Sequence, residues 1–103
     1  MAPYVPVAQI SEIPSGQAKT VQAGGRPIAL CNVNGTFYAI ENRCSHDDGP
    51  LGEGMLADHR IECPRHGAQF DVTNGQALTL PAVRPVHVFP VKVEGTQIFV
   101  EVP

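Results

Sequence analysis

The dipeptide Asn34-Gly35 constrains the fold more than any other feature of this sequence. It separates two β-rich runs, ALCNV and TFYAI. A two-residue type I′ turn needs positive φ at both central positions, and asparagine and glycine adopt positive φ at low cost. The pattern therefore predicts a tight antiparallel β-hairpin that turns at residues 34 and 35.

Short β-like runs also flank this hairpin, and no stretch shows a sustained 3.6-residue periodicity. Ten glycines and ten prolines in 103 residues favour short strands and tight turns over helices. The expected fold is all-β, a small antiparallel β-sandwich or barrel, in one domain over residues 1–103. A loop with room for one helical turn is expected over residues 10–15. Besides the hairpin, the predicted strands are residues 4–7, 20–23, 55–57, 60–62, 68–72, 77–79, 86–89, 91–93 and 97–102.

Charge and terminal composition exclude several classes of function. The formal net charge is −3 and no run of Lys or Arg occurs, so we expect no nucleic-acid surface. The N-terminus lacks the basic start and apolar run of a secretory signal, and no window approaches the roughly 18 apolar residues of a membrane span. Three cysteines are an odd number, which does not suit a secreted disulfide framework. A soluble, cytoplasmic protein is expected.

In residues 42–81, short β-like runs alternate with glycine-containing loops. This segment holds most of the residues that could bind a metal. Three of the four histidines and two of the three cysteines lie there. The segment Cys44-Ser45-His46 is followed, after 16 residues, by Cys63-Pro64-Arg65-His66. Two Cys and two His can coordinate either one tetrahedral zinc ion or a [2Fe–2S] cluster with mixed ligands.

The arrangement of the four residues bears on this choice. Zinc fingers usually pair Cys with Cys at one end and His with His on a helix, whereas here each loop supplies one Cys and one His. A two-iron cluster with cysteines on one iron and histidines on the other suits two matching loops. A catalytic Cys63–His66 pair is possible on geometry but leaves Cys44 and His46 unexplained. A structural zinc module stays open as an alternative.

The two boxes CSH and CPRH resemble the double motif of the Rieske family. The stretch FD-x-x-x-G, formed by Phe70, Asp71 and Gly75, and the flanking β runs extend this resemblance over essentially the whole chain. The resemblance implies the Rieske fold, with residues 42–81 as a loop-rich cluster-binding subdomain. It also implies one [2Fe–2S] cluster per chain.

The same resemblance assigns the ligands. It implies that Cys44 and Cys63 bind an inner iron, and that His46 and His66 bind an outer iron near the surface. Imidazole ligands raise the potential of such a cluster above that of four-cysteine clusters, because neutral imidazoles lower its negative charge. No catalytic residue is expected.

Departures from the respiratory branch of the family predict a low reduction potential. Members of that branch carry one extra cysteine in each loop, and a serine and a tyrosine hydroxyl near the cluster. This chain has no extra cysteine, and Ala68 and Phe70 occupy the two hydroxyl positions. Hydrogen bonds to sulfur stabilise the reduced state, so their loss places the potential at the low end of the Rieske range, on the order of −150 mV.

The resemblance implies a soluble Rieske-type ferredoxin rather than an enzyme. Such a carrier moves one electron at a time from a flavin-dependent ferredoxin reductase to a terminal oxygenase, as a monomer that binds both partners transiently. A small Rieske-like subunit of a larger oxidoreductase, such as nitrite reductase, is the alternative.

The remaining reactive side chains have simpler interpretations. Cys31 lies in an apolar β run and is expected to be a buried free thiol. His59 and His87 are expected to be surface or structural histidines. Three acids beside the first box are either solvated or a docking patch for a basic partner surface: Asp47, Asp48 and Glu53.

Overall fold

The computed structural model describes residues 3–45, 48–80, 82 and 84–102. Within these residues the secondary structure is β-strand with two short 3₁₀ turns and no α-helix, so the all-β prediction is confirmed. The elements are β1 (Tyr4–Gln9), η1 (Ile10–Glu12), β2 (Ala18–Ala23), β3 (Arg26–Val33), β4 (Thr36–Glu41), η2 (Leu51–Glu53), β5 (Met55–Ala57), β6 (Arg60–Glu62), β7 (Gln69–Asp71), β8 (Val88–Phe89), β9 (Val91–Glu94) and β10 (Gln97–Glu101).

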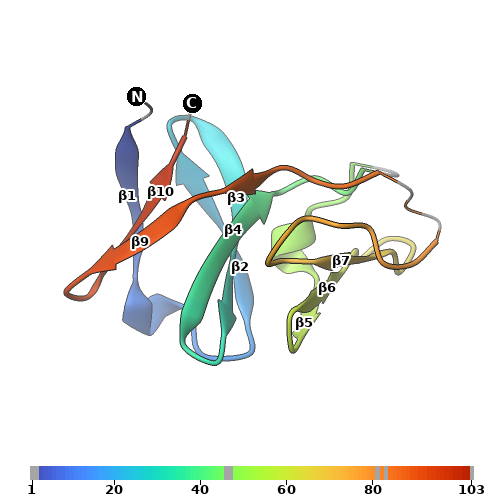
Figure 1. Ribbon diagram of the computed structural model, residues 1–103, viewed down its shortest axis with the longest axis horizontal. Helices are drawn as coiled ribbons and strands as arrows, with labels where there is room; N and C mark the ends of the chain where they lie inside the picture. The colour runs from blue at the N-terminus through green and yellow to red at the C-terminus, as the bar shows by residue number, and fades with distance from the viewer. Residues whose placement is uncertain (1–2, 46–47, 81, 83, 103) are drawn as a thin grey trace.

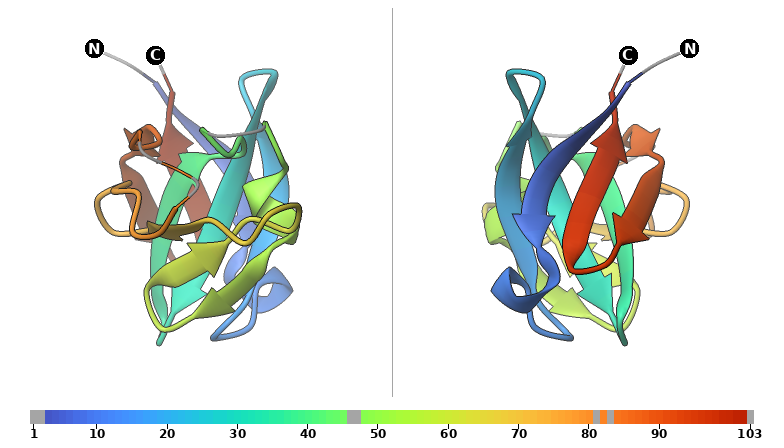
Figure 2. Two further views of the ribbon diagram at one scale, coloured as in Figure 1. Left: turned by 90° about the vertical axis from the view of Figure 1, so that its right-hand side faces the viewer. Right: turned by 90° about the vertical axis from the view of Figure 1, so that its left-hand side faces the viewer.

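The strands form three antiparallel sheets. Their orders are β1-β10-β9, β2-β3-β4-β8 and β5-β6-β7. The first two sheets face each other at the end of the molecule that carries both termini, and the third lies at the opposite end (Figure 1). In Figure 2, the left view has the third sheet nearest the viewer, and the right view has the first sheet nearest the viewer. We call the first two sheets the base.

The predicted hairpin is confirmed as the β3–β4 turn. Val33 pairs with Thr36, and Asn34 and Gly35 have φ values of 53° and 90°. The side chain of Asn32 stabilises this turn, since its Oδ1 accepts the Gly35 N–H at 2.7 Å while its Nδ2 donates to the Ile13 carbonyl at 2.8 Å. These bonds satisfy the buried amide of Asn32.

Strand β3 joins two hydrophobic cores because it is buried on both faces. Successive side chains of a strand point to opposite faces. Ile28 and Leu30 therefore pack into the base core, whereas Ala29 and Cys31 pack into a second core shared with the third sheet. Strand β3 thus fixes the third sheet against the base.

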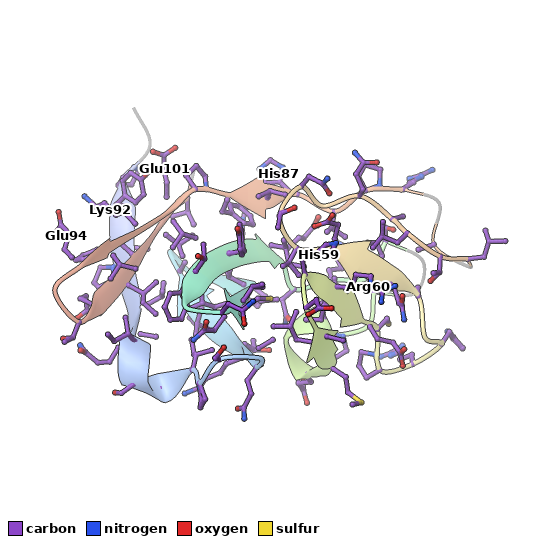
Figure 3. All side chains as sticks on the ribbon, turned by 60° about the horizontal axis from the view of Figure 1, so that its bottom comes forward. His59, Arg60, His87, Lys92, Glu94 and Glu101 are labelled. Carbon is purple, nitrogen blue, oxygen red and sulfur yellow. The ribbon has the colours of Figure 1, made fainter. Side chains whose placement is uncertain are left out.

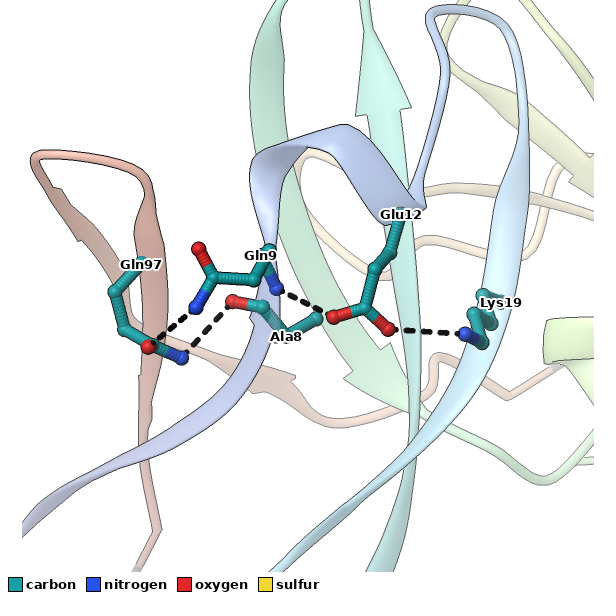
Figure 4. A network of polar contacts seen from close by, with 5 residues as sticks. All are labelled: Ala8, Gln9, Glu12, Lys19 and Gln97. Atoms are coloured by element: carbon teal, nitrogen blue, oxygen red, sulfur yellow. Dashed lines mark hydrogen bonds and ion pairs between the residues drawn. The ribbon is translucent and has the colours of Figure 1, made fainter.

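The predicted helical turn in residues 10–15 is confirmed as η1. The Gln9 backbone N–H donates to Glu12 Oε1 at 2.8 Å, and Lys19 Nζ lies 3.2 Å from Glu12 Oε2 (Figure 4). These two contacts, the backbone hydrogen bond first, lower the pKa of the exposed Glu12 carboxyl. The side chains of Gln9 and Gln97 also bond to each other between β1 and β10. Together with the contact to Lys19 on β2, this bond ties the turn to the first and second sheets.

Two strand predictions are corrected. Residues 77–79 form no strand: Ala77 makes a single bridge to Phe70, and the Gln69 N–H then bonds to the Thr79 hydroxyl instead of a backbone carbonyl. This side-chain acceptor interrupts the ladder. Strand β8 is also shorter than predicted, since residues 86–87 precede its first ladder pair. No helix among the described residues has the length and apolarity to cross a membrane.

Candidate metal centre

The two predicted cysteine ligands come from different strands and meet in one core. Two residues separate Cys44 from the end of β4, and Cys63 directly follows β6. Both side chains are buried, with 0% and 1% of their surface exposed, and both belong to the core that β3 shares with the third sheet. The structure therefore brings together residues that are 19 positions apart in the sequence.

The loops that carry these cysteines are closed by the same two backbone hydrogen bonds. In the first loop, Cys44 N–H donates to Gly49 O at 2.8 Å and Asp48 N–H donates to Cys44 O at 2.9 Å. In the second, Cys63 N–H donates to Ala68 O at 2.7 Å and Gly67 N–H donates to Cys63 O at 3.1 Å. Each cysteine thus begins a loop with the same hydrogen-bond pattern. We call residues 44–49 the first loop and residues 63–68 the second loop.

The FD-x-x-x-G stretch repeats this closure a third time. Asp71 N–H donates to Gln76 O at 2.9 Å, and Gly75 N–H donates to Asp71 O at 2.7 Å. Gly75 has a φ of 79°, and a Cβ there would lie 2.2 Å from the Val86 carbonyl oxygen. Glycine is required at this position for both reasons, which gives the motif a structural rather than a ligating role.

The fifth residue of each cysteine loop has positive φ. In the second loop this residue is Gly67, with φ of 78°. In the first it is Asp48, with φ of 62°, and aspartate is one of the few residues that tolerate this conformation. The Asp48 carboxylate accepts a hydrogen bond from Arg43 Nε at 2.5 Å, which raises the pKa of the Arg43 guanidinium.

The exposure of the donors fits a cluster with mixed ligands. His66 is exposed, whereas Cys63, three residues earlier, is buried. His46 lies outside the described residues. Among the described residues, no three His, Cys, Asp or Glu side chains gather into a site for a metal ion. Two buried thiols with an exposed imidazole suit an inner iron bound by sulfur and an outer iron bound by nitrogen.

The 3₁₀ turn η2 fixes the first loop to the base. Leu51 is fully buried in the same core as Cys44. The Gly52 N–H donates to Asn42 Oδ1 at 2.6 Å, and a Cβ on Gly52 would lie 2.3 Å from Thr20 Oγ1. The sequence analysis did not predict that Asn42 positions the first loop. An amide side chain two residues before Cys44 could have indicated this role, because Asn side chains often bond to nearby backbone groups.

The two positions that carry hydroxyls in other branches lie in the core beside the second loop. Ala68 and Phe70 are both fully buried and share the core with Cys63. Ala68 accepts the Cys63 N–H through its carbonyl, so its backbone adjoins this cysteine. Neither side chain has a donor for a sulfur.

The other reactive side chains lie as predicted. Cys31 is a fully buried free thiol, and burial raises its pKa to about 12. His59 is half-exposed with Nε2 3.7 Å from Asp71 Oδ2, and His87 is exposed with its ring 4.8 Å from the Phe89 ring. They come from different parts of the chain, as the labels in Figure 3 show. Of the three acids beside the first box, Asp48 is paired with Arg43, Glu53 is exposed in η2, and Asp47 lies outside the described residues.

Comparison with known proteins decides the family. The family model of the Rieske [2Fe-2S] domain matches residues 3–90. The chain belongs to the Rieske [2Fe–2S] family. The ferredoxin subunit of 3-phenylpropionate/cinnamic acid dioxygenase from Shigella boydii is 44% identical over 95 residues, which cover 91% of this chain and 89% of that protein.

Two solved Rieske structures are also similar over nearly their whole length. The ferredoxin of carbazole 1,9a-dioxygenase from Nocardioides aromaticivorans IC177 superposes with a TM-score of 0.91 at 34% identity, covering 95% of this chain and 96% of that one. A chain in the complex of reduced oxygenase and oxidized ferredoxin of carbazole 1,9a-dioxygenase gives 0.89 at 34% identity, covering 95% and 92%. The predictions of a Rieske-type ferredoxin fold, a [2Fe–2S] cofactor and an electron-carrier component are confirmed.

Proposed function

We propose that this Rieske ferredoxin carries single electrons from a flavin-dependent reductase to the terminal oxygenase of a ring-dioxygenase system. The named relatives support this role, because two are ferredoxins of dioxygenases and one structure is a complex of an oxygenase with its ferredoxin. A cytoplasmic monomer that binds each partner transiently is the simplest form of such a carrier.

We also propose that residues 42–81 form the cluster-binding subdomain of the single domain, residues 1–103, and that four side chains hold the cluster. Cys44 and Cys63 are assigned to the inner iron, and His46 and His66 to the outer iron. The buried cysteines in equivalent loop positions support the first assignment. The exposure of His66 supports its place on the outer iron.

A bound [2Fe–2S] cluster supplies one-electron redox chemistry, and the residues of the chain determine where it occurs. The buried thiolates hold their side of the site away from water, and Leu51, Ala68 and Phe70 fill the core around them. The exposed His66 places the opposite side at the surface, where a partner can approach closely. The chain itself binds no organic substrate in this account.

The observation that carries the proposal is the pair of identically closed loops, each starting at a buried cysteine. A zinc module would not require matching loops. A catalytic Cys63–His66 pair would not require Cys44 in the same core.

We assign a low reduction potential to this carrier, on the order of −150 mV. The support is that the two buried positions beside the second loop, Ala68 and Phe70, lack hydroxyls that could donate to sulfur. A spectroelectrochemical titration of the purified protein measures this potential directly. A midpoint well above 0 mV would contradict the argument from these two residues.

Electron transfer is tested with the holoprotein, a purified flavin-dependent reductase and a purified terminal oxygenase of a ring-dioxygenase system. NADH-driven bleaching of the visible absorbance should require the reductase, and reoxidation under air should require the oxygenase loaded with its substrate. Product formation should depend on the amount of this chain. Turnover of the oxygenase at an undiminished rate without this chain would contradict the proposed function.

A further inference from the structure

A groove opens beside the first loop, where β4 leads into it. It has two parts, of about 520 Å³ and 230 Å³, and both are lined by Glu41 and Arg43. The charged or titratable side chains that line the rest are Arg26, His87, Asp48 and Arg84. The groove therefore combines residues from four separate segments of the chain.

The sheet register places these residues side by side. Glu41 pairs with Ile28, and the Glu41 N–H donates to the His87 carbonyl at 2.9 Å, so β3, β4 and the segment before β8 meet here. Arg26 lies two residues before Ile28, and its guanidinium sits over the Phe89 ring, 5.7 Å from the centroid. The groove thus lies beside Phe89, which belongs to the base core.

Positive charge is concentrated in this groove although the chain is acidic overall. Among the described residues, three Lys or Arg side chains line it, against two Asp or Glu side chains, in a chain with net charge −3. Both carboxylates are already engaged: Glu41 Oε1 accepts the His87 N–H at 3.0 Å, and Asp48 accepts from Arg43. Within the described part of the chain, Arg26 and Arg84 make no ion pair.

The first loop is bonded to the wall of this groove. Ser45 Oγ donates to the Arg84 carbonyl oxygen at 2.7 Å. Ser45 is the neighbour of Cys44, so a molecule seated between Arg43 and Arg84 lies directly beside the loop that carries the cluster. This position suits a docking contact that brings a redox partner close.

We propose that this groove docks a carboxylate-rich surface segment of a redox partner protein. The inference rests on the proposed function. The acids beside the first box were expected to be either solvated or a docking patch for a basic partner; of these, the Asp48 carboxylate is bonded to Arg43, and Arg84 lines the groove beside it. Complementary charge at such a site accelerates encounter and is weakened by salt.

The test compares two variants with the same change of charge. Arg84→Glu changes a side chain of the groove. Lys92→Glu is the control and changes β9 in the first sheet, where Lys92 lies over the Tyr4 ring (Figure 3). The second-order rate constants for electron transfer with the reductase and with the oxygenase are measured by stopped flow at low and high salt. Retention of the visible cluster absorbance verifies each holoprotein, and Arg26→Glu replaces Arg84→Glu should the latter lose it.

With at least one partner, Arg84→Glu should lower the rate constant about tenfold at low salt, and Arg84→Gln about threefold. Both differences should shrink to less than about twofold at 0.5 M salt, and Lys92→Glu should stay within about twofold of wild type throughout. Equal rate constants for Arg84→Glu and Lys92→Glu with both partners would overturn the docking surface and leave the electron-carrier role intact.

A second measurement covers the case in which wild-type protein exchanges electrons with neither partner, which contradicts the proposed function. Anisotropy of a fluorescein-labelled hexaglutamate peptide then reports on the groove alone. At least about fivefold weaker binding to Arg84→Glu than to Lys92→Glu would support an acidic ligand, and equal binding would overturn it.

Discussion

The first and second loops share the same two closing hydrogen bonds but differ in almost every side chain. Counting from the cysteine, Ser45 corresponds to Pro64, Asp48 to Gly67, and Gly49 to Ala68. The histidine is the third residue of the first loop and the fourth of the second. Only the two cysteines occupy the same position, and both are buried. The difference shows that loop closure depends on hydrogen bonds and one positive φ, which several sequences can supply.

The two loops also differ in what holds them in place. The first loop follows the base strand β4 and relies on side chains: Arg43 bonds to Asp48, and Ser45 bonds to the Arg84 carbonyl. The second loop lies between β6 and β7, whose ladder pairs Glu62 with Gln69 directly across it. We therefore expect side-chain substitutions to disturb the first loop and backbone restrictions to disturb the second.

The largest expected effect tests what the loops share. Cys44→Ser and Cys63→Ser should each reduce bound iron and acid-labile sulfide at least about tenfold, because the cluster needs a thiolate from both loops. Iron and sulfide analysis of freshly purified protein measures this. Cys31→Ala is the matched control in the same core, and it should keep its cluster because Cys31 is a protonated, buried thiol. Retention of a full cluster by either serine variant would contradict the ligand assignment.

The next effect separates the loops by backbone strain. Gly67→Ala should lower the free energy of unfolding by about 1–2 kcal/mol, because alanine is strained at positive φ. Apart from its chain neighbours, no atom of the described residues lies within 4 Å of the added Cβ, so steric clash does not contribute. Asp48→Gly relieves the same strain and loses one exposed ion pair, so its change should stay within about 0.5 kcal/mol.

Chemical denaturation of the holoprotein, followed by circular dichroism, measures both changes. A loss at Asp48→Gly as large as that at Gly67→Ala would show that the side-chain contact to Arg43, rather than backbone conformation, dominates the stability of the first loop. That result would sharpen the distinction between the loops, whereas unchanged stability in Gly67→Ala would contradict it.

A smaller effect on the reduction potential is expected from added hydroxyl groups at Ala68 and Phe70, which both follow Cys63 in the sequence. Ala68→Ser and Phe70→Tyr should each raise the reduction potential, on the order of 50 mV, the equivalent of one ordinary hydrogen bond of about 1 kcal/mol for a one-electron couple. Spectroelectrochemical titration measures the shift. Phe37→Tyr on β4 adds the same hydroxyl beside the base core and should leave the potential unchanged. A lowered potential in Phe70→Tyr would count against the assigned position of these residues.

The smallest effect tests the side-chain anchoring of the first loop. Ser45→Ala removes the hydrogen bond to the Arg84 carbonyl and should cost less than about 1 kcal/mol of stability. It should also increase amide hydrogen exchange in residues 44–49 while leaving residues 63–68 unchanged. Mass-spectrometric exchange of the holoprotein resolves the two segments. Equal increases in both loops would show that they are coupled as one unit.

Sequence patterns predicted the hairpin and the paired boxes because their signals are local. Asn34-Gly35 specifies a turn through its own conformational preferences, and the two boxes predict ligands through their resemblance to the Rieske motif. The absence of a strand at residues 77–79 could not be predicted, because a threonine hydroxyl replaces a carbonyl as the acceptor of the Gln69 N–H. The role of Asn42 was missed because its partner, Gly52, is brought close only by the fold.

The basic groove illustrates the same limit for charge. The acids next to the first box are adjacent in sequence and suggested an acidic surface. Arg26 and Arg84 are 58 positions apart and join Arg43 only through the order of strands β3, β4 and β8. The proposal of an acidic partner segment therefore depends on tertiary structure and could not be drawn from the sequence.

Mixed ligation by both loops is the central claim, and one spectroscopic measurement tests it most directly. The protein is labelled with ¹⁵N-histidine, reduced, and examined by EPR and electron–nuclear double resonance. The account predicts a [2Fe–2S] signal with an average g below the free-electron value and hyperfine coupling to two histidine nitrogens. It also predicts that His66→Cys loses one of the two couplings. A reduced cluster without histidine coupling, or fresh protein without iron, would contradict the account.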